Sequence, residues 1–238
     1  MEKIPDIIHE SWHVHLQPLF DDIKMQKIKY DILPKQKFFP APQDIFRVFQ
    51  MPIYKIKVVV LDQDVYSNPH EAIGYSFAVP HNIKIPPSLE VIKQEIINSK
   101  VERDSAVNIE SDKWRELKHW RQQGVFLLNS ALTVESKDPG SHLGYWIWFT
   151  REVIKIISLY NKDRAIWLMW GAKARQFTGN IHLYLKYRGE FKGDYNYVLE
   201  SVHPAAEKYD NAQKFSGCNH FNIVNDILKK QGKTIINW

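Results

Sequence analysis

The stretch Lys57-Val-Val-Val-Leu-Asp-Gln-Asp-Val-Tyr-Ser67 decides the fold class. Its residues 58–61 are apolar and mostly β-branched, which is too short for a helix and typical of a buried strand. A polar cluster follows at once, from Asp62 to Ser67, and carries two carboxylates, an amide and a phenol. Ligands of open parallel sheets bind just beyond the carboxyl ends of the strands, so this cluster is the first candidate for chemistry. The alternative is that these residues only cap the strand and turn the chain.

Three later apolar runs also end in a polar residue or a glycine. They cover residues 124–129, 165–171 and 195–203, and the last ends in His203, held before Pro204. Helical patterns cover 146–160, 172–180 and 219–231, and one or two more lie within 10–29. Strands that alternate with helices predict parallel pairing through right-handed crossovers. We therefore expect an α/β fold with a four-stranded parallel sheet, and one domain over residues 1–238.

Polar residues at the ends of these runs would converge in space. Parallel strands place their carboxyl ends at one edge of a sheet, so Asp64, Asn129, Gly171 and His203 are expected to meet there. A carboxylate, an amide and an imidazole in one place form a candidate site. The alternative is that each residue caps its own strand. Four strands that end in the same way favour the site.

Composition is that of an ordinary soluble globular protein. The 238 residues are 44% hydrophobic and 25% charged, and no apolar run approaches the roughly 20 residues that span a bilayer. The first residues lack the apolar core of a signal peptide, and Cys218 is the only cysteine, so we expect an intracellular, cytoplasmic protein without a membrane segment. The formal net charge of +5 is compatible with a nucleic-acid partner but does not require one.

Short motifs lie at the strand ends and in the loops between them. They are Asp62-Gln63-Asp64-Val65-Tyr66-Ser67, Ile73-Gly74-Tyr75-Ser76-Phe77, Pro86-Pro87-Ser88-Leu89, Gly124-Val-Phe-Leu-Leu-Asn129-Ser-Ala-Leu-Thr133, Trp170-Gly171-Ala172, His203-Pro204, Gly217-Cys218-Asn219-His220-Phe221 and Ile236-Asn237-Trp238. In this order they resemble motifs of the main family of uracil-DNA glycosylases, among them G-Q-D-P-Y-H, H-G-L-C-F, G-V-L-L-L-N-x-x-L-T, W-G-S and H-P-S-P-L-S. Each motif alone is weak, but the whole ordered set is specific.

The resemblance implies a three-layer α/β/α sandwich around the four-stranded parallel sheet. It also implies flipping of deoxyuridine out of DNA and hydrolysis of its N-glycosidic bond, which leaves an abasic site in base-excision repair. No metal and no cofactor are implied, and His13 and His15 are expected to be an ordinary surface pair. The implied partners are single- or double-stranded DNA that contains uracil and a DNA-mimicking inhibitor protein. We expect a monomer.

Two residues receive catalytic roles by this resemblance. Asp64 would orient the attacking water and stabilise the cationic sugar, because an oxocarbenium-like centre needs a nearby anion. His203 would hydrogen-bond O2 of the departing uracil anion, for which a neutral imidazole suffices. A lone histidine is more often structural, although a position before proline at a strand end is less typical of that.

Four residues are implied to recognise the base. Asn129 can accept from uracil N3–H and donate to O4, a pattern that cytosine reverses. Tyr66 would exclude the methyl group of thymine, Phe77 would stack on the base, and Gln63 would contribute through its backbone. The alternatives are a turn cap for Asn129 and ordinary core packing for Tyr66 and Phe77.

Two further groups of residues are implied to contact DNA. Those expected to hold phosphates are Ser88, Gly171, Ala172, Pro204 and Ala205. The family's leucine wedge, which fills the space of the flipped base, is missing after His203, and the candidates to replace it are Glu207, Lys208 and Tyr209.

Departures from the family motifs keep a second function open. Asp62, Val65 and Ser67 stand where the family has glycine, proline and histidine. Asp62 adds a charge beside Asp64, and Glu207 would repel phosphate. The alternative to an active glycosylase is therefore a catalytically weakened DNA-binding or replication-processivity protein on the same fold.

Overall fold

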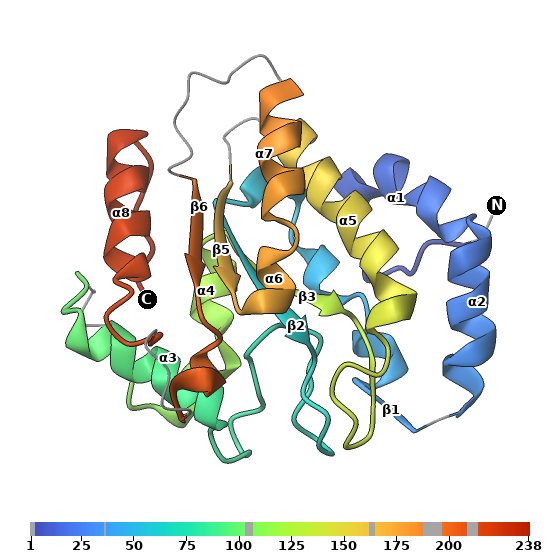
Figure 1. The fold of residues 1–238 in the computed structure, drawn as a ribbon, viewed down its shortest axis with the longest axis horizontal. Coiled ribbons are helices and arrows are strands. Elements are labelled where there is room, and N and C mark those ends of the chain that lie inside the picture. Colours follow the sequence, from blue (N-terminus) through green and yellow to red (C-terminus); the bar gives the residue numbers. More distant parts are fainter. Residues whose placement is uncertain (1–2, 36, 103–106, 162–164, 188–196, 209–213) are drawn as a thin grey trace.

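The computed structural model of the chain describes residues 3–35, 37–102, 107–161, 165–187, 197–208 and 214–238. Its central sheet has four parallel strands in the order β3-β2-β5-β6 (Figure 1). They are β2 (Val58–Asp64), β3 (Val125–Ala131), β5 (Ile166–Trp170) and β6 (Val198–Ser201). The predicted four-stranded parallel sheet is confirmed.

Strand β2 is longer than the sequence predicted. Its apolar run ends at Leu61, but the pairing continues, with Asp62 opposite Asn129 and Asp64 opposite Ala131 of β3. The expectation that the strand stops before Asp62 was wrong, because the neighbouring strand supplies backbone partners beyond the apolar run. Side chains alternate along a strand, so Asp62 and Asp64 lie on the same face.

Helices cover both faces of the sheet and make three layers (Figure 1). On one side lie α1 (His13–Phe20), α2 (Ile23–Asp31), α5 (Leu143–Tyr160) and α7 (Thr178–Tyr187). On the other side lie α3 (Pro87–Asn98), α4 (Lys118–Gln122) and α8 (His220–Lys230), while the short α6 (Ala172–Arg175) contacts β2 and β5. The α/β/α architecture implied by the resemblance is confirmed.

Shorter elements complete the fold. The 3-10 helices are η1 (Glu10–Trp12), η2 (Leu33–Lys35), η3 (Pro42–Asp44), η4 (Arg47–Gln50), η5 (Ile53–Lys55), η6 (Asp112–Glu116) and η7 (Pro204–Lys208). A separate antiparallel pair joins β1 (Phe38–Phe39) to β4 (Val134–Glu135). The fourth predicted strand, 195–203, is reduced to the four residues of β6, and residues 195 and 196 lie outside the described ranges.

Burial explains why these segments pack as they do. Residues Val58 to Leu61 are completely buried, as expected for a central strand covered on both faces. The loop that carries Phe77 is also drawn into the core, and Gly74 permits this. Its φ is +78°, and a Cβ there would lie 2.1 Å from the carbonyl oxygen of Asp44. In the described part of the chain, no helix combines the length and apolar character needed to cross a membrane.

Candidate active site

The carboxyl ends of the strands bring together the residues that the sequence placed there. His203 follows β6 and its Nε2 lies 3.1 Å from Oδ1 of Asp62 on β2. Asp62 pairs with Asn129 of β3 in the sheet, and Asp64 lies two residues further along β2 on the same face as Asp62, so the acid, the amide and the imidazole lie at one edge. The ring of His203 lies 5.7 Å from that of Phe77, centroid to centroid. The predicted convergence of an acid, an amide and an imidazole at one sheet edge is therefore found.

His203 is held from both of its ring nitrogens. Nδ1 accepts a 3.0 Å hydrogen bond from the Ala205 N–H, so the proton lies on Nε2, which donates to Asp62. Burial alone would lower the pKa of His203, but the hydrogen bond and charge of Asp62, aided by the charge of Asp64, raise it above its ordinary value. Asp62 thus favours the charged imidazolium, whereas the Ala205 N–H favours the neutral ring.

Gly171 gives His203 the space it occupies. Its φ is +96°, and a Cβ built there would lie 3.0 Å from Cβ of His203. The Gly171 N–H donates to the Ser201 carbonyl, which ties the turn to the end of β6. Ala172 begins α6 and is exposed. The geometry gives Gly171 a packing role, and phosphate binding at Gly171 and Ala172 stays a prediction.

Asp64 is the last residue of β2 and is only partly exposed. Its Oδ2 accepts a hydrogen bond from the N–H of Gly140. Burial raises the pKa of the Asp64 carboxyl and the charge of Asp62 raises it further, while the Gly140 N–H opposes both effects. A carboxylate held in this way has a fixed orientation and a reduced hydration shell, which are the properties needed to position a water or to face a developing cation.

Asn129 is a buried amide with an unused acceptor. The residue is 2% exposed, and its Oδ1 has no hydrogen-bond partner among the described residues. A buried acceptor without a donor costs about 1–3 kcal/mol. Such a group at a candidate site indicates a ligand that brings a donor. This observation favours a recognition role for Asn129 over the turn cap.

Tyr66 and Ser88 form a hydrogen-bonded pair beneath this edge. The Tyr66 hydroxyl donates to the Phe77 carbonyl at 3.2 Å and lies 3.1 Å from Oγ of Ser88. Burial raises the pKa of the Tyr66 phenol far above its ordinary value, so the group stays neutral. Ser88 is 6% exposed, and its hydroxyl faces Tyr66. Phosphate binding by Ser88 stays a prediction. Its backbone N–H lies in the first turn of α3, where N–H groups have no partner within the helix, and is the group of Ser88 that would bind a phosphate.

Phe77 occupies a constrained position beside the histidine. Its φ is +61°, which is unusual for a residue with a bulky side chain, and it is 2% exposed. Its ring packs 5.4 Å from that of Trp170, centroid to centroid. Strained backbone of this kind is concentrated at functional sites. Stacking on a base stays a prediction for Phe77, now with the imidazole of His203 as its neighbour.

The loop after His203 is organised by Glu207. Its Oε2 accepts hydrogen bonds from the N–H groups of Phe215 at 2.9 Å and Ser216 at 3.1 Å. Burial would raise the pKa of Glu207, but these amides and the charge of Lys214 lower it. A carboxylate engaged in this way is not free to enter a base stack, so Glu207 is a poor wedge. The Lys208 side chain and all of Tyr209 lie outside the described residues.

Two participants were not identified as such from the sequence. Asp62 was noted as a replacement for glycine and as a charge beside Asp64, but no contact with His203 was expected, although its spacing from Asp64 already placed both carboxylates on one face of a strand. Gly140 gave no signal, because its contribution is a backbone N–H from a loop distant in sequence. His13 and His15, the expected surface pair, contact the Ile8 carbonyl and the Tyr160 ring respectively.

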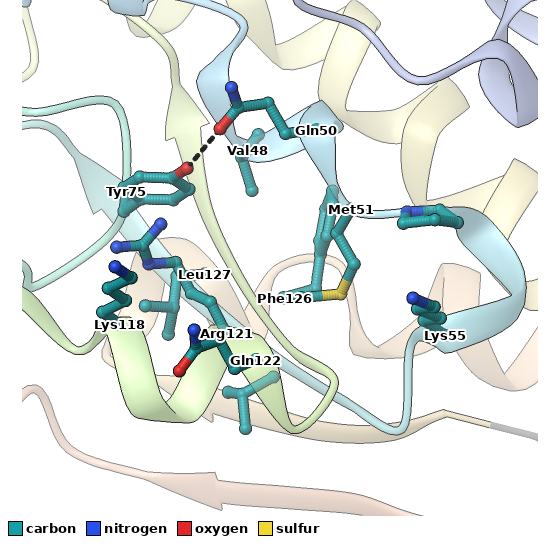
Figure 2. Close-up of a pocket in the computed structure, with 12 residues that line it drawn as sticks. Val48, Gln50, Met51, Lys55, Tyr75, Lys118, Arg121, Gln122, Phe126 and Leu127 are labelled. Atoms are coloured by element: carbon teal, nitrogen blue, oxygen red, sulfur yellow. Dashed lines mark hydrogen bonds between the residues drawn. The ribbon is translucent and has the colours of Figure 1, made fainter.

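A pocket of about 330 Å³ lies at the opposite end of the strands (Figure 2). Its wall includes the first residues of β3 and the segment before β2, and none of the predicted site residues lines it. Arg121 stacks 3.8 Å from the Tyr75 ring centroid, and the Tyr75 hydroxyl donates to Gln50. This pocket combines cations with an apolar floor, and the described residues that line it include no carboxylate.

Comparisons with known proteins bear on this geometry. No family model matches the chain. A uracil-DNA glycosylase of Borreliella burgdorferi is 38% identical to it, with 97% of this chain and 98% of that protein covered. A uracil-DNA glycosylase of Campylobacter lari is 36% identical, with 100% and 96% covered.

The chain belongs to the uracil-DNA glycosylase family. Among solved structures, the crystal structure of mimivirus uracil-DNA glycosylase has a TM-score of 0.79 and 26% identity, and covers 98% of this chain and 87% of that one. A variant of mimivirus UNG in complex with UGI has a TM-score of 0.81 at 24% identity, which supports the fold alone. The resemblance stated from the motifs is confirmed.

Proposed function

We propose that the chain excises uracil from DNA with Asp64 and His203 as its catalytic residues. Membership of the uracil-DNA glycosylase family supports the reaction. The observation that carries the assignment of the site is the unused Oδ1 of the buried Asn129, at the same sheet edge as Asp64 and His203. Uracil N3–H is a donor of the kind that this acceptor lacks.

The proposed reaction separates charge in two directions. The bond between C1′ of the sugar and N1 of uracil breaks, and its electron pair leaves with the base as an anion delocalised onto O2. Asp64 faces the cationic sugar and orients the water that attacks C1′, and the water's proton passes to solvent through the carboxylate. The neutral His203 donates Nε2–H to O2 of the leaving anion, which lowers the cost of its departure.

Base selection follows from the amide and the phenol. Asn129 accepts from N3–H through Oδ1 and donates to O4 through its NH₂ group. Cytosine would leave both groups facing the wrong partner, which costs far more than a missing methylene would. Tyr66 is held by Phe77 and Ser88, so it is a fixed wall against a methyl group on C5.

An oligonucleotide with a single uracil tests the assignment. Excision is followed by alkaline cleavage of the abasic site, for wild type, Asp64→Asn and His203→Ala. Asp226→Asn, an exposed position on α8, is the matched control. We expect cleavage by wild type and the control and strong losses in the other two. Cleavage unaffected by either substitution would remove the assignment of roles. Wild type that binds DNA without cleavage would instead favour the processivity protein.

Several finer properties belong to the same proposal. We propose that residues 1–238 act as one domain, supported by a core that joins residues from Ile4 to Trp238. We also propose that the protein is a monomer. We propose a cytoplasmic location and binding of uracil-containing single- and double-stranded DNA. Because UGI binds mimivirus UNG, we also propose that it inhibits this chain. Light scattering of the protein with and without UGI measures both the oligomeric state and the complex.

A further inference from the structure

The carboxylate of Asp62 lies where two inward-facing donors converge. Oδ1 accepts the Gln63 N–H at 2.7 Å and faces Nε2 of His203 at 3.1 Å. These two donors come from different elements, the strand β2 and the segment after β6. An oxygen that receives one backbone N–H and one imidazole N–H has the environment of an oxyanion site.

The proposed function assigns His203 to the leaving base, and the family resemblance assigns the Gln63 backbone to the same base. His203 Nε2–H is directed at O2 of the uracil anion, and the Gln63 backbone at the same edge of the ring. Each donor has a single proton to give. One oxygen can therefore receive both bonds at full strength, and a second acceptor can only displace the first.

We propose that Asp62 is an internal competitor for O2 of the leaving uracil, and that it thereby sets the affinity for the base and the rate of its departure. This proposal rests on the proposed function, because that function supplies the role of His203. A carboxylate oxygen and the O2 of a uracil anion carry similar charge and accept similar hydrogen bonds. Two such oxygens at one pair of donors repel each other as well as compete.

Competition requires that the Asp62 carboxylate move away from its two donors, and the surroundings of Asp62 limit this movement. Its backbone carbonyl accepts a 2.8 Å hydrogen bond from Ser130 Oγ, and its backbone pairs with β3. The main chain is thus fixed, and the carboxylate can leave its donors only by side-chain rotation. The side chain of Asp62 is 11% exposed, so rotation moves a charge within a mostly dry region.

Charged and titratable groups on every side oppose or favour that rotation. Asp64 on the same strand repels the carboxylate, His203 attracts it, and the Tyr66 phenol lies within its electrostatic reach. Loss of the His203 hydrogen bond leaves Asp62 with the repulsion of Asp64 and without its imidazole partner. The free energy needed to break the Asp62–His203 hydrogen bond must come from the contacts that uracil makes. Asp62 therefore weakens binding of the free base and slows its release from the sugar.

Two variants separate competition from simple support of His203. Asp62→Ala removes both acceptor oxygens, whereas Asp62→Asn keeps one neutral oxygen in nearly the same volume and guards against a folding failure of the first. Asp226→Ala is the control. The readouts are the dissociation constant for free uracil, the single-turnover excision rate, and the pKa of His203 measured by NMR.

For Asp62→Ala we expect the dissociation constant for uracil to fall at least tenfold, the excision rate to rise, and the pKa of His203 to fall. For Asp62→Asn, all three values should lie between those of Asp62→Ala and those of wild type. Unchanged or weaker uracil binding in both variants, or excision lost in both, would overturn the proposal and make Asp62 a support for His203. If wild type excises no uracil, the proposed function fails, but uracil affinity and the His203 titration still decide whether Asp62 competes.

Discussion

The two ends of the central sheet differ in how their polar side chains are held. At the carboxyl end, Asp62 and Asp64 are bonded to groups from distant segments, namely His203 and the Gly140 N–H. At the amino end, Lys55, Lys118 and Arg121 surround an apolar floor (Figure 2), and Arg121 Nε has no partner among the described residues. The polar groups at the carboxyl end are hydrogen-bonded across the fold and can direct a reaction, whereas at the amino end Arg121 stacks on the aromatic ring of Tyr75 and has no acidic partner among the described residues that line the pocket.

The largest expected effect on the excision rate comes from replacing Asp64. Asp64→Asn removes the anion that faces the sugar cation, and we expect the excision rate to fall about 10²–10³-fold. The matched change at the other end, Arg121→Met, keeps the stem of the side chain and should alter the rate less than about twofold, because the pocket of Arg121 shares no residue with the site. Single-turnover assays measure both. Equal losses would abolish the functional difference between the two ends.

The next effect concerns the unused acceptor. Asn129→Ala leaves N3–H and O4 of uracil without partners, and we expect excision to fall about 10–100-fold. The free energy of unfolding should stay within about 1 kcal/mol of wild type, because loss of packing is offset by removal of a buried group without a donor. Denaturant unfolding gives the second value. A strongly destabilised variant would make Asn129 a structural residue and favour the turn cap.

A smaller effect is expected in the dependence of the rate on pH. The roles proposed require an ionised Asp64 and a neutral His203, so excision declines as pH falls through either pKa. Asp62 raises both pKa values, and Asp62→Asn should lower both and move the acidic limb of the normalised profile to lower pH. At the wild-type midpoint the gain is at most about twofold, because half of the maximal rate is already present there. A limb that stays in place would show that Asp62 does not control these titrations.

The smallest effect is expected in the loop. Glu207→Leu restores the residue type of the family's wedge, but it also removes the acceptor for two backbone N–H groups. We expect less than about a threefold gain on duplex substrate and a loss of about 1–2 kcal/mol in the free energy of unfolding. The gain is measured as the excision rate on single-stranded and duplex oligonucleotides, with Glu207→Gln as the control. A large gain on duplex alone would return Glu207 to the set of wedge positions.

The sequence could predict features that depend on neighbouring residues in the chain, but not hydrogen bonds between residues that are far apart in it. The apolar runs gave the strands of the sheet, and their polar ends gave Asp64, Asn129 and His203, because parallel topology fixes where strand ends meet. The bond between Asp62 and His203 joins residues 141 apart in the chain, and no pattern in either segment reports it. The Gly140 N–H is a backbone group, which any residue but proline offers. The Glu207 bonds were hidden for the same reason.

Glu207 has a consequence for how this chain can diverge. Its carboxylate fastens η7 to the buried Phe215, so the two ends of the intervening segment are joined independently of what lies between them. A change in the number of residues between η7 and Phe215 would therefore leave the position of the His203 imidazole unchanged. Relatives could therefore differ in the length of the segment between η7 and Phe215, and gain different contacts there, while the reaction centre stays the same.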